Sequence, residues 1–337
     1  MRKHVAGSNP VSGTKFEAPG ESQGLFFWLT RRQGEGMSQE QDERAAKFIA
    51  NAVAYVTNEP LVFAQYESLH PELFPTLYSD SQAEFAKRMD DVLEHIGGPP
   101  RLYLLDVDKS PPPADVYPQA ALQEVIEVFS RARKSVLRAH LFMTGSTLLS
   151  KNPEMMELGG AEREKLFIVH TNKAFWEHAE AAYIRLFSFW DRIGQVLDFA
   201  FFNIRKFDHN GFYSVMEKIA ANVAPMNKDL AGGAAWKRLR KFQTSEKEDG
   251  LKWLLLRRNL IIHSLHLHPV IESDEEDDLF KSQYNHLEKS HREKLRPKDP
   301  QGEAELLVGQ LRAATTLFDD VIRLLKFTPS QHMSYRR

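Results

Sequence analysis

The chain has no cysteine among its 337 residues. This absence excludes disulfide bonds, thiolate metal ligands and cysteine nucleophiles. A zinc site would have to use histidine and carboxylate ligands alone. No apolar run approaches the roughly 18–20 residues that a helix needs to cross a bilayer. We therefore expect a cytoplasmic protein with no membrane contact.

The chain also lacks an excess of charge of either sign. It has 44 Lys and Arg residues and 46 Asp and Glu residues, which gives a formal net charge of −2. Any nucleic-acid contact must therefore come from a local basic patch. No phosphate-cradling glycine loop, Rossmann fingerprint or serine nucleophile elbow is present, since Gly232-Gly233 indicates only a turn. We expect no cofactor.

Composition divides the chain into three parts. Residues 1–37 are polar and rich in Gly, Pro and Ser, which predicts a flexible leader; their apolar patch at 24–29 is too short and lies too far from the N-terminus for a signal peptide. Residues 38–160 form a predicted helical region of unknown role. Residues 165–327 form a predicted helical bundle, interrupted by a charged insertion at 271–301.

Apolar residues recur at helical spacing through most of the chain. The helix at 40–58 is expected to turn Ala46, Ile49, Ala50, Val53 and Tyr55 toward a core. Residues 102–107 are a possible short strand and 152–164 a loop. The predicted helices cover 40–58, 81–96, 119–149, about 176–201, 211–222, a basic helix from about Trp236, 246–265 and 304–327. This pattern predicts an all-α, antiparallel helical bundle.

The helix at 246–265 carries the most informative segment. Arg258, Asn259 and His263 lie within a run of otherwise apolar residues. Burying such groups without partners costs about 1–3 kcal/mol each. They therefore either form an internal network or face a substrate or partner.

Arg258 and His263 resemble the R-x4-6-H signature of the HEPN superfamily (higher eukaryotes and prokaryotes nucleotide-binding domains). Arg88/His95, Arg133/His140, Arg163/His170 and Arg257/His263 also fit this spacing. Only Arg258 is followed directly by Asn, as is common in active members. The motif also precedes an insertion and a terminal amphipathic helix, which is similar to the HEPN order. The resemblance covers residues 165–327 as a single HEPN domain.

The resemblance implies a homodimer in which two motifs face each other and cleave RNA without metal. His263 would transfer protons as a general acid or base, Arg258 would stabilise charge on phosphate, and Asn259 would orient the reacting groups. These three residues are the expected catalytic set.

One expected feature is missing. Many active members carry an acidic residue followed four positions later by a basic one on the earlier long helix. Here Glu177, Glu180, Asp191 and Asp198 are followed by Ala181, Ile184, Gln195 and Phe202. Asp191, Asp198 and Arg205 recur at intervals of seven on one side of this helix, so they either contact the motif or form solvated or paired groups.

Basic residues near the motif are candidates for RNA phosphates. They are Arg257, Lys237, Arg238, Arg240 and Lys241; the alternative for the last four is a solvated helix face. The acidic run at 272–278 would repel RNA. A metal site at His263, His266 and His268 is disfavoured, because His268 directly precedes Pro269 and no carboxylate lies at a zincin spacing. We expect no metal.

A non-catalytic reading stays open. The chain would then be a helical scaffold that binds a nucleotide or a protein partner such as an antitoxin, and the polar trio would fix packing or a dimer. That reading predicts a His263 imidazole hydrogen-bonded inside one subunit. The catalytic reading predicts an imidazole open to an interfacial cleft.

Overall fold

The computed structural model describes residues 39–77, 81–97, 116–152, 161–205, 211–263, 267 and 297–328. All regular elements in these ranges are helices, which confirms the all-α prediction. They are α2 (Gln39–Leu69), α3 (Gln82–Gly97), α4 (Tyr117–Lys151), α5 (Ala161–Phe202), α6 (Gly211–Asn222), α7 (Lys228–Gly232), α8 (Ala234–Thr244), α9 (Leu251–His263) and α12 (Pro300–Leu325).

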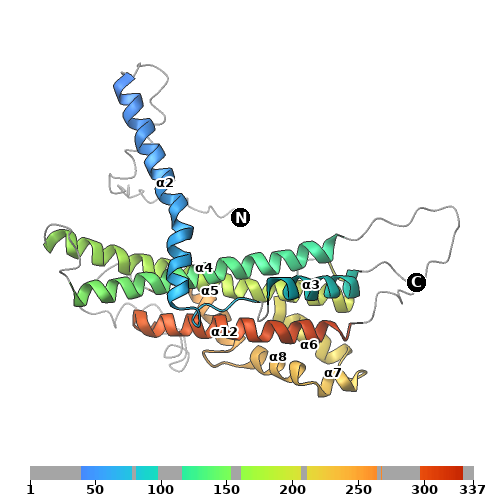
Figure 1. The fold of residues 1–337 in the computed structure, drawn as a ribbon. Helices are drawn as coiled ribbons and strands as arrows, with labels where there is room; N and C mark the ends of the chain where they lie inside the picture. Colours follow the sequence, from blue (N-terminus) through green and yellow to red (C-terminus); the bar gives the residue numbers. More distant parts are fainter. Residues whose placement is uncertain are drawn as a thin grey trace, which may run out of the picture. The chain divides into compact units, whose positions relative to one another are not determined.

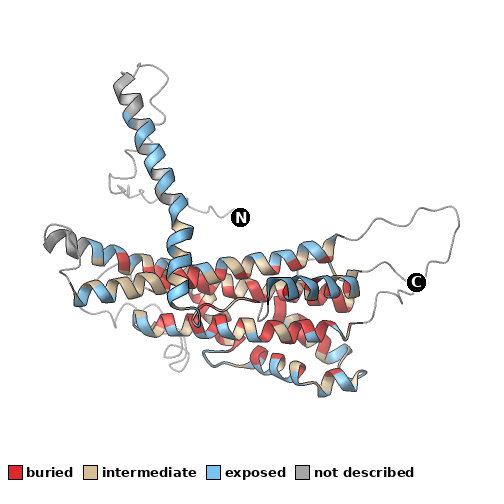
Figure 2. Ribbon diagram, in the orientation of Figure 1, coloured by how far each residue is buried: buried red, intermediate tan, exposed pale blue. Residues whose placement is uncertain are grey.

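Helices α4 and α5 form the centre of the bundle, and they run antiparallel along most of their length (Figure 1). Ring contacts join Tyr117 to Phe199, Phe129 to Phe189 and Phe142 to His178, so positions on α5 fall as positions on α4 rise. The middle of α5 is buried on several sides, and Figure 2 shows buried residues concentrated where the central helices lie together. This agrees with its aromatic residues at several helical faces, since α4, α6, α9 and α12 all pack against it.

Two compact units divide the chain, residues 1–61 and 62–337. Helix α2 begins in the first unit and ends in the second, and it continues through Pro60 well beyond its predicted end. The core face predicted for it is wrong: Ile49 and Val53 are 54% and 57% exposed, and Ala46 and Ala50 are exposed too. The side chain of Tyr55 lies outside the described residues. Periodicity marked an apolar stripe, but a stripe is buried only where another element covers it.

Several helix boundaries differ from the prediction for local reasons. Helix α5 begins at Ala161, inside the predicted loop at 152–164. Helix α9 begins at Leu251 rather than 246, because the Ser245 hydroxyl accepts from the Lys247 amide and holds a turn. Helix α12 begins at Pro300, where the Asp299 carboxylate accepts from the Gly302 amide at 2.8 Å. Helix α7, capped by Asn227, was not predicted.

Some predictions fall outside the described residues. These are the leader at 1–37, the possible strand at 102–107, most of the loop at 152–164 and most of the charged insertion at 271–301. Every described helix is too short or too polar to span a bilayer.

Candidate functional site

Helix α9 carries Arg257 and Arg258 in very different surroundings, and Arg257 is the buried one. Arg257 is 1% exposed, and its guanidinium donates to Glu303 on α12, which is itself completely buried, at 2.7 Å. The Tyr183 hydroxyl donates to the same carboxylate at 2.6 Å, and the Lys298 amide donates at 2.8 Å. The Arg257 guanidinium also lies 5.0 Å from the Trp253 ring centroid. Arg257 therefore joins α5, α9 and α12 from inside the core.

Arg258 points in another direction, because successive residues of a helix lie about 100° apart. Its guanidinium lies 5.5 Å from the centroid of the Phe187 ring on α5. Its Nη1 donates to the Oδ1 of Asn259 at 2.8 Å. Both residues are half-buried. The structure thus brings two of the three predicted catalytic residues into direct contact on the rim of α9.

Asp191 lies one turn beyond Phe187 on α5 and faces the same rim. Burial raises the pKa of Asp191 to about 6, while the charges of Arg258 and Arg192 act in the opposite direction. Arg258 is therefore close enough to stabilise the ionised carboxylate. No hydrogen bond or ion pair within 4 Å joins Asp191 to Arg258 among the described residues, so Asp191 acts on the motif through its charge.

Asp198 and Arg205, which recur with Asp191 at intervals of seven on α5, have different partners. Asp198 is buried and accepts from the Lys218 ammonium group at 3.3 Å. The Arg205 guanidinium lies 5.7 Å from the centroid of the Tyr117 ring and 5.4 Å from that of Phe199. These groups join α5 to α6 and α4. The interval of seven identified a shared side of α5, but only Asp191 lies opposite α9.

Two glycines let α6 begin beside Asp191. A Cβ atom on Gly194 would lie 2.5 Å from the backbone nitrogen of Phe212, so α5 and α6 approach too closely for any side chain there. Gly211 has φ of +46°, and a Cβ atom on it would collide with the Asp191 carboxylate. Neither glycine was predicted to shape the site, although Gly194 inside an aromatic helix is a signal of close packing.

His263 is the last residue of α9 and is exposed. Its neighbour Ile262 is 43% exposed, so an apolar side chain borders the imidazole. Just beyond, the amide of Leu267 donates to the Glu180 carboxylate on α5 at 2.6 Å, which fixes the chain after the helix. Among the hydrogen bonds of the described residues, none joins His263 to Arg258 or Asn259. The imidazole is thus accessible and lies on the same helical face as Asn259.

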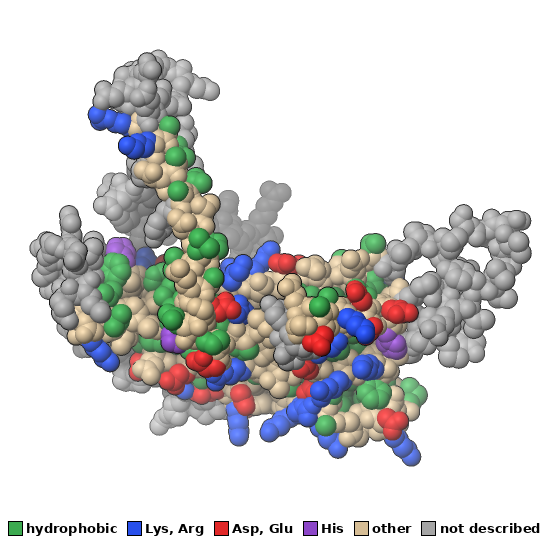
Figure 3. Space-filling model, in the orientation of Figure 1, with side chains coloured by type: hydrophobic (Ala, Val, Ile, Leu, Met, Phe, Trp, Pro, Cys, Tyr) green, Lys and Arg blue, Asp and Glu red, His purple; other side chains and the backbone are tan. Residues whose placement is uncertain are grey.

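The predicted basic RNA contacts lie partly in ion pairs. The RNA-binding role predicted for Arg257 does not fit its position, since a guanidinium buried against Glu303 cannot reach a phosphate. Arg238 donates to Asp320 through two nitrogens at 2.7 and 2.6 Å. Arg240 donates to Glu217 at 2.8 Å. Lys237 and Lys241 are exposed, and Figure 3 shows Lys and Arg side chains gathered over α8.

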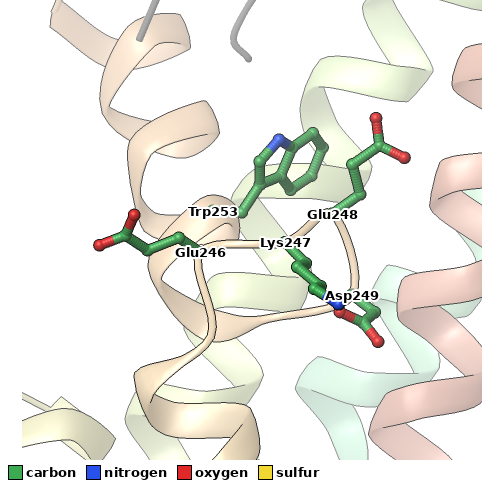
Figure 4. Close-up of a pocket in the computed structure, with 5 residues that line it drawn as sticks. All are labelled: Glu246, Lys247, Glu248, Asp249 and Trp253. Carbon is green, nitrogen blue, oxygen red and sulfur yellow. The ribbon is translucent and has the colours of Figure 1, made fainter. Parts of the chain in front are cut away.

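A separate hollow of about 560 Å³ lies at the other end of α9 (Figure 4). Its lining consists of Glu246, Lys247, Glu248, Asp249 and Trp253, from the α8–α9 loop and the first turn of α9. Three of the five residues are acidic, so their charges oppose a phosphate ligand. His266 and His268, considered as metal ligands with His263, lie outside the described residues.

Residues 157–321 match a family model described as HEPN_Cthe2314-like HEPN. This range includes α5 through most of α12, and with them Asp191, Arg258, Asn259 and His263. Searches among curated proteins and among solved structures found no match to the chain. The family match agrees with the helical bundle and with the motif on α9, and it identifies residues 157–321 as a HEPN-like domain.

Proposed function

We propose that the protein is a metal-independent endoribonuclease that acts as a homodimer, with Arg258, Asn259 and His263 of each subunit at a shared site. The observation that carries the proposal is the arrangement of α9. Arg258 and Asn259 are joined at its rim, and the imidazole of His263 is exposed on the same helix. HEPN domains commonly dimerise.

The proposed reaction is an internal transfer at phosphorus. The ribose 2′-oxygen forms a bond to the adjacent phosphorus, and the bond from phosphorus to the 5′-oxygen breaks. The products are a 2′,3′-cyclic phosphate and a 5′-hydroxyl. The 2′-hydroxyl loses one proton and the leaving oxygen gains one, so His263 of one subunit serves as base and His263 of its partner as acid.

Arg258 and Asn259 prepare the site for this charge. The Arg258 guanidinium is a planar donor that suits phosphate oxygens, and its electrostatic role grows as negative charge develops in the transition state. The side-chain oxygen of Asn259 and the face of Phe187 hold the guanidinium in place. Asp191 acts through Arg258 as a positioning residue.

The exposure of His263 supports this proposal over the packing alternative. A histidine that served packing would be enclosed and hydrogen-bonded within its subunit, whereas His263 is exposed at a helix end. The buried polar role on α9 belongs to Arg257 instead. A scaffold that binds a nucleotide or a protein partner such as an antitoxin is the alternative outcome of the test below.

The test is cleavage of single-stranded RNA under single-turnover conditions in EDTA. We expect products that end in 2′,3′-cyclic phosphate. His263→Ala removes a proton-transfer group and should slow cleavage by about 10²–10⁴-fold. Arg258→Ala should slow it by about 10²–10³-fold.

Arg323→Ala is the matched control, because Arg323 is an exposed arginine on α12. Its cleavage rate should equal that of the wild type. If varied RNAs remain intact with the wild-type protein, or if the His263 and Arg258 variants cleave at its rate, the scaffold reading replaces the nuclease.

A further inference from the structure

A row of basic and aromatic side chains lies along the packed pair α4 and α5, away from the rim of α9. On α4, Arg131, Ser135, Arg138 and Phe142 follow one another at intervals of three or four residues and so share one helical face. On α5, His178 and Arg185 are seven residues apart and share a face as well. We call these six residues the arginine seam.

Direct contacts join the two helices along the seam. The Nη1 of Arg185 donates to the hydroxyl of Ser135, and it lies 3.4 Å from the backbone oxygen of Arg131. Four residues further along α4 than Arg138, the Phe142 ring stacks on the His178 ring with centroids 5.5 Å apart and planes inclined by 16°. Arg185 is thereby placed between Arg131 and Arg138.

The seam concentrates positive charge. The two acceptors that Arg185 has among the described residues are neutral oxygens, so these bonds leave its charge uncompensated. Partial burial, and then the charges of Arg138 and Arg131, lower the pKa of Arg185. Arg131 and Lys134 are exposed. Like charges held together in this way favour an anionic ligand.

The carboxylates on α4 lie at one end of the seam or on another face of that helix, and on α5 Glu177 and Glu180 lie on either side of His178. Glu127 and Glu124 precede Arg131 by about one and two turns on α4. Glu124 pairs with Arg192 at 3.5 Å, and Glu127 accepts from Gln123 at 3.3 Å. Glu67 on α2 pairs with Arg133, and the Arg138 guanidinium lies 5.0 Å from the ring centroid of Phe63 on the same helix. The basic part of the seam therefore runs from Arg131 toward the Phe142–His178 stack.

Geometry restricts the ligand further. Arg131 and Arg138 are seven residues apart, which is about 10 Å along a helix. A ligand that uses both must carry several negative charges in a row. The ring stack offers a π face, which a nucleobase uses and an acidic peptide does not. Phe142 and His178 are only half-buried.

We propose that the arginine seam binds the sugar–phosphate backbone of single-stranded RNA, with the Phe142–His178 stack receiving a base. This inference rests on the proposed function, in which RNA is the substrate. It assigns to α4 a role in binding that RNA. Helix α4, which carries four of the six seam residues, ends at Lys151, before the matched range 157–321.

The seam is separate from the cleavage site. Arg185 and Phe187 are two residues apart on α5, about 200° around the helix, and Phe187 faces Arg258. The seam therefore lies across α5 from the rim of α9. Its loss should weaken RNA binding and leave the rate of cleavage of bound RNA intact.

The test is the affinity of the full chain for a fluorescent, uncleavable 2′-O-methyl RNA, measured by anisotropy at several salt concentrations. The triple variant Arg131→Gln, Arg138→Gln, Arg185→Gln should raise Kd by about tenfold or more and reduce the salt slope by about 2, since each lost phosphate contact removes about 0.7. Lys134 lies three residues beyond Arg131 on α4 and borders the seam. The double variant Arg131→Gln, Lys134→Gln changes only exposed residues, and it should reduce the slope by about 1.4 even if the triple variant fails to fold.

The matched control is Lys228→Gln, Arg312→Gln, Lys326→Gln, which removes three exposed charges on α7 and at or just after α12. We expect its Kd to stay within about twofold of the wild type. Equal weakening by control and seam variants would overturn the proposal, because it would indicate an effect of net charge alone. Unchanged binding by both the triple and the double variant would also overturn it.

Two further measurements identify the ligand. His178→Leu should weaken RNA binding by roughly tenfold and leave binding of inorganic polyphosphate unchanged, because only RNA has bases to stack. Binding of poly-glutamate but not of RNA would assign the seam to an acidic protein segment and overturn the proposal. Binding of RNA through the seam without cleavage of unmodified RNA would contradict the proposed nuclease and leave the seam in place.

Discussion

Arg257 and Arg258 are neighbours on α9, yet they lie in opposite surroundings. Arg257 forms an ion pair inside the core, where both partners are almost completely inaccessible. Arg258 lies on the rim against Phe187, near Asp191. A rotation of about 100° separates a packing residue from a candidate catalytic one. The comparison indicates that an arginine inside an apolar run has no fixed role. The direction in which its side chain leaves the helix determines whether it lies in the core or on the rim.

The largest expected effect on stability is at the buried pair. Glu303→Ala removes the acceptor of Arg257, Tyr183 and the Lys298 amide, and it leaves a guanidinium uncompensated in the core. Its free energy of unfolding should fall by about 3–5 kcal/mol. Arg257→Ala should cost a similar amount. Denaturant titration measures both changes.

Arg258→Ala is the control for this prediction. It removes a cation–π contact and one hydrogen bond at a half-buried rim, so the loss should be about 1 kcal/mol. Equal losses for Arg257 and Arg258 would contradict the division of α9 into a core face and a rim.

A smaller loss of stability is expected from a substitution at Gly194, where α6 begins beside Asp191. Gly194→Ala adds a Cβ atom against the backbone of Phe212 and must displace α6. Overpacking of this kind costs about 1–3 kcal/mol. Gly145→Ala is a suitable comparison, since no atom lies within 4 Å of the added Cβ atom and the change should stabilise α4 slightly. Thermal unfolding of the two variants in parallel gives the difference, and equal midpoints would be inconsistent with the close contact.

A pH-dependent effect is expected at Asp191. Burial raises its pKa from 3.8 to about 6, so the folded protein holds this proton more tightly than the unfolded chain does. The contribution of Asp191 to the free energy of unfolding therefore falls as pH rises from about 4 to about 6, and it is constant above that. Asp191→Asn lacks this contribution.

Denaturant titrations at several pH values test the prediction. Relative to the wild type, Asp191→Asn should become more stable as pH rises from about 4 to about 6, with no further gain above. A difference between the two proteins that is independent of pH would show that Asp191 titrates normally.

Much of the fold could be predicted from sequence, because helical periodicity and breakers act locally. The long apolar helix around Trp190 and the breaks at Gly97 and Gly211 correspond to observed elements. Burial was less predictable. The apolar stripe of Ile49 and Val53 is exposed, since periodicity does not reveal whether a neighbour covers a face.

The site was predicted in part for the same reason. The pairing of Arg258 with Asn259 follows from their sequence proximity, and the exposure of His263 agrees with a helix end. The role of Arg257 could not be predicted, because its partner Glu303 lies 46 residues away beyond the insertion. The closeness of Asp191 to Arg258 depends on how α5 crosses α9, which is a tertiary property.

The most direct test of the central claim is the cleavage rate of His263→Ala beside its unfolding midpoint, measured on one preparation. His263 is exposed, so the midpoint should match that of the wild type while cleavage in EDTA falls by at least about 10²-fold. A variant that unfolds far more easily than the wild type, or that cleaves RNA at the same rate, would contradict the account.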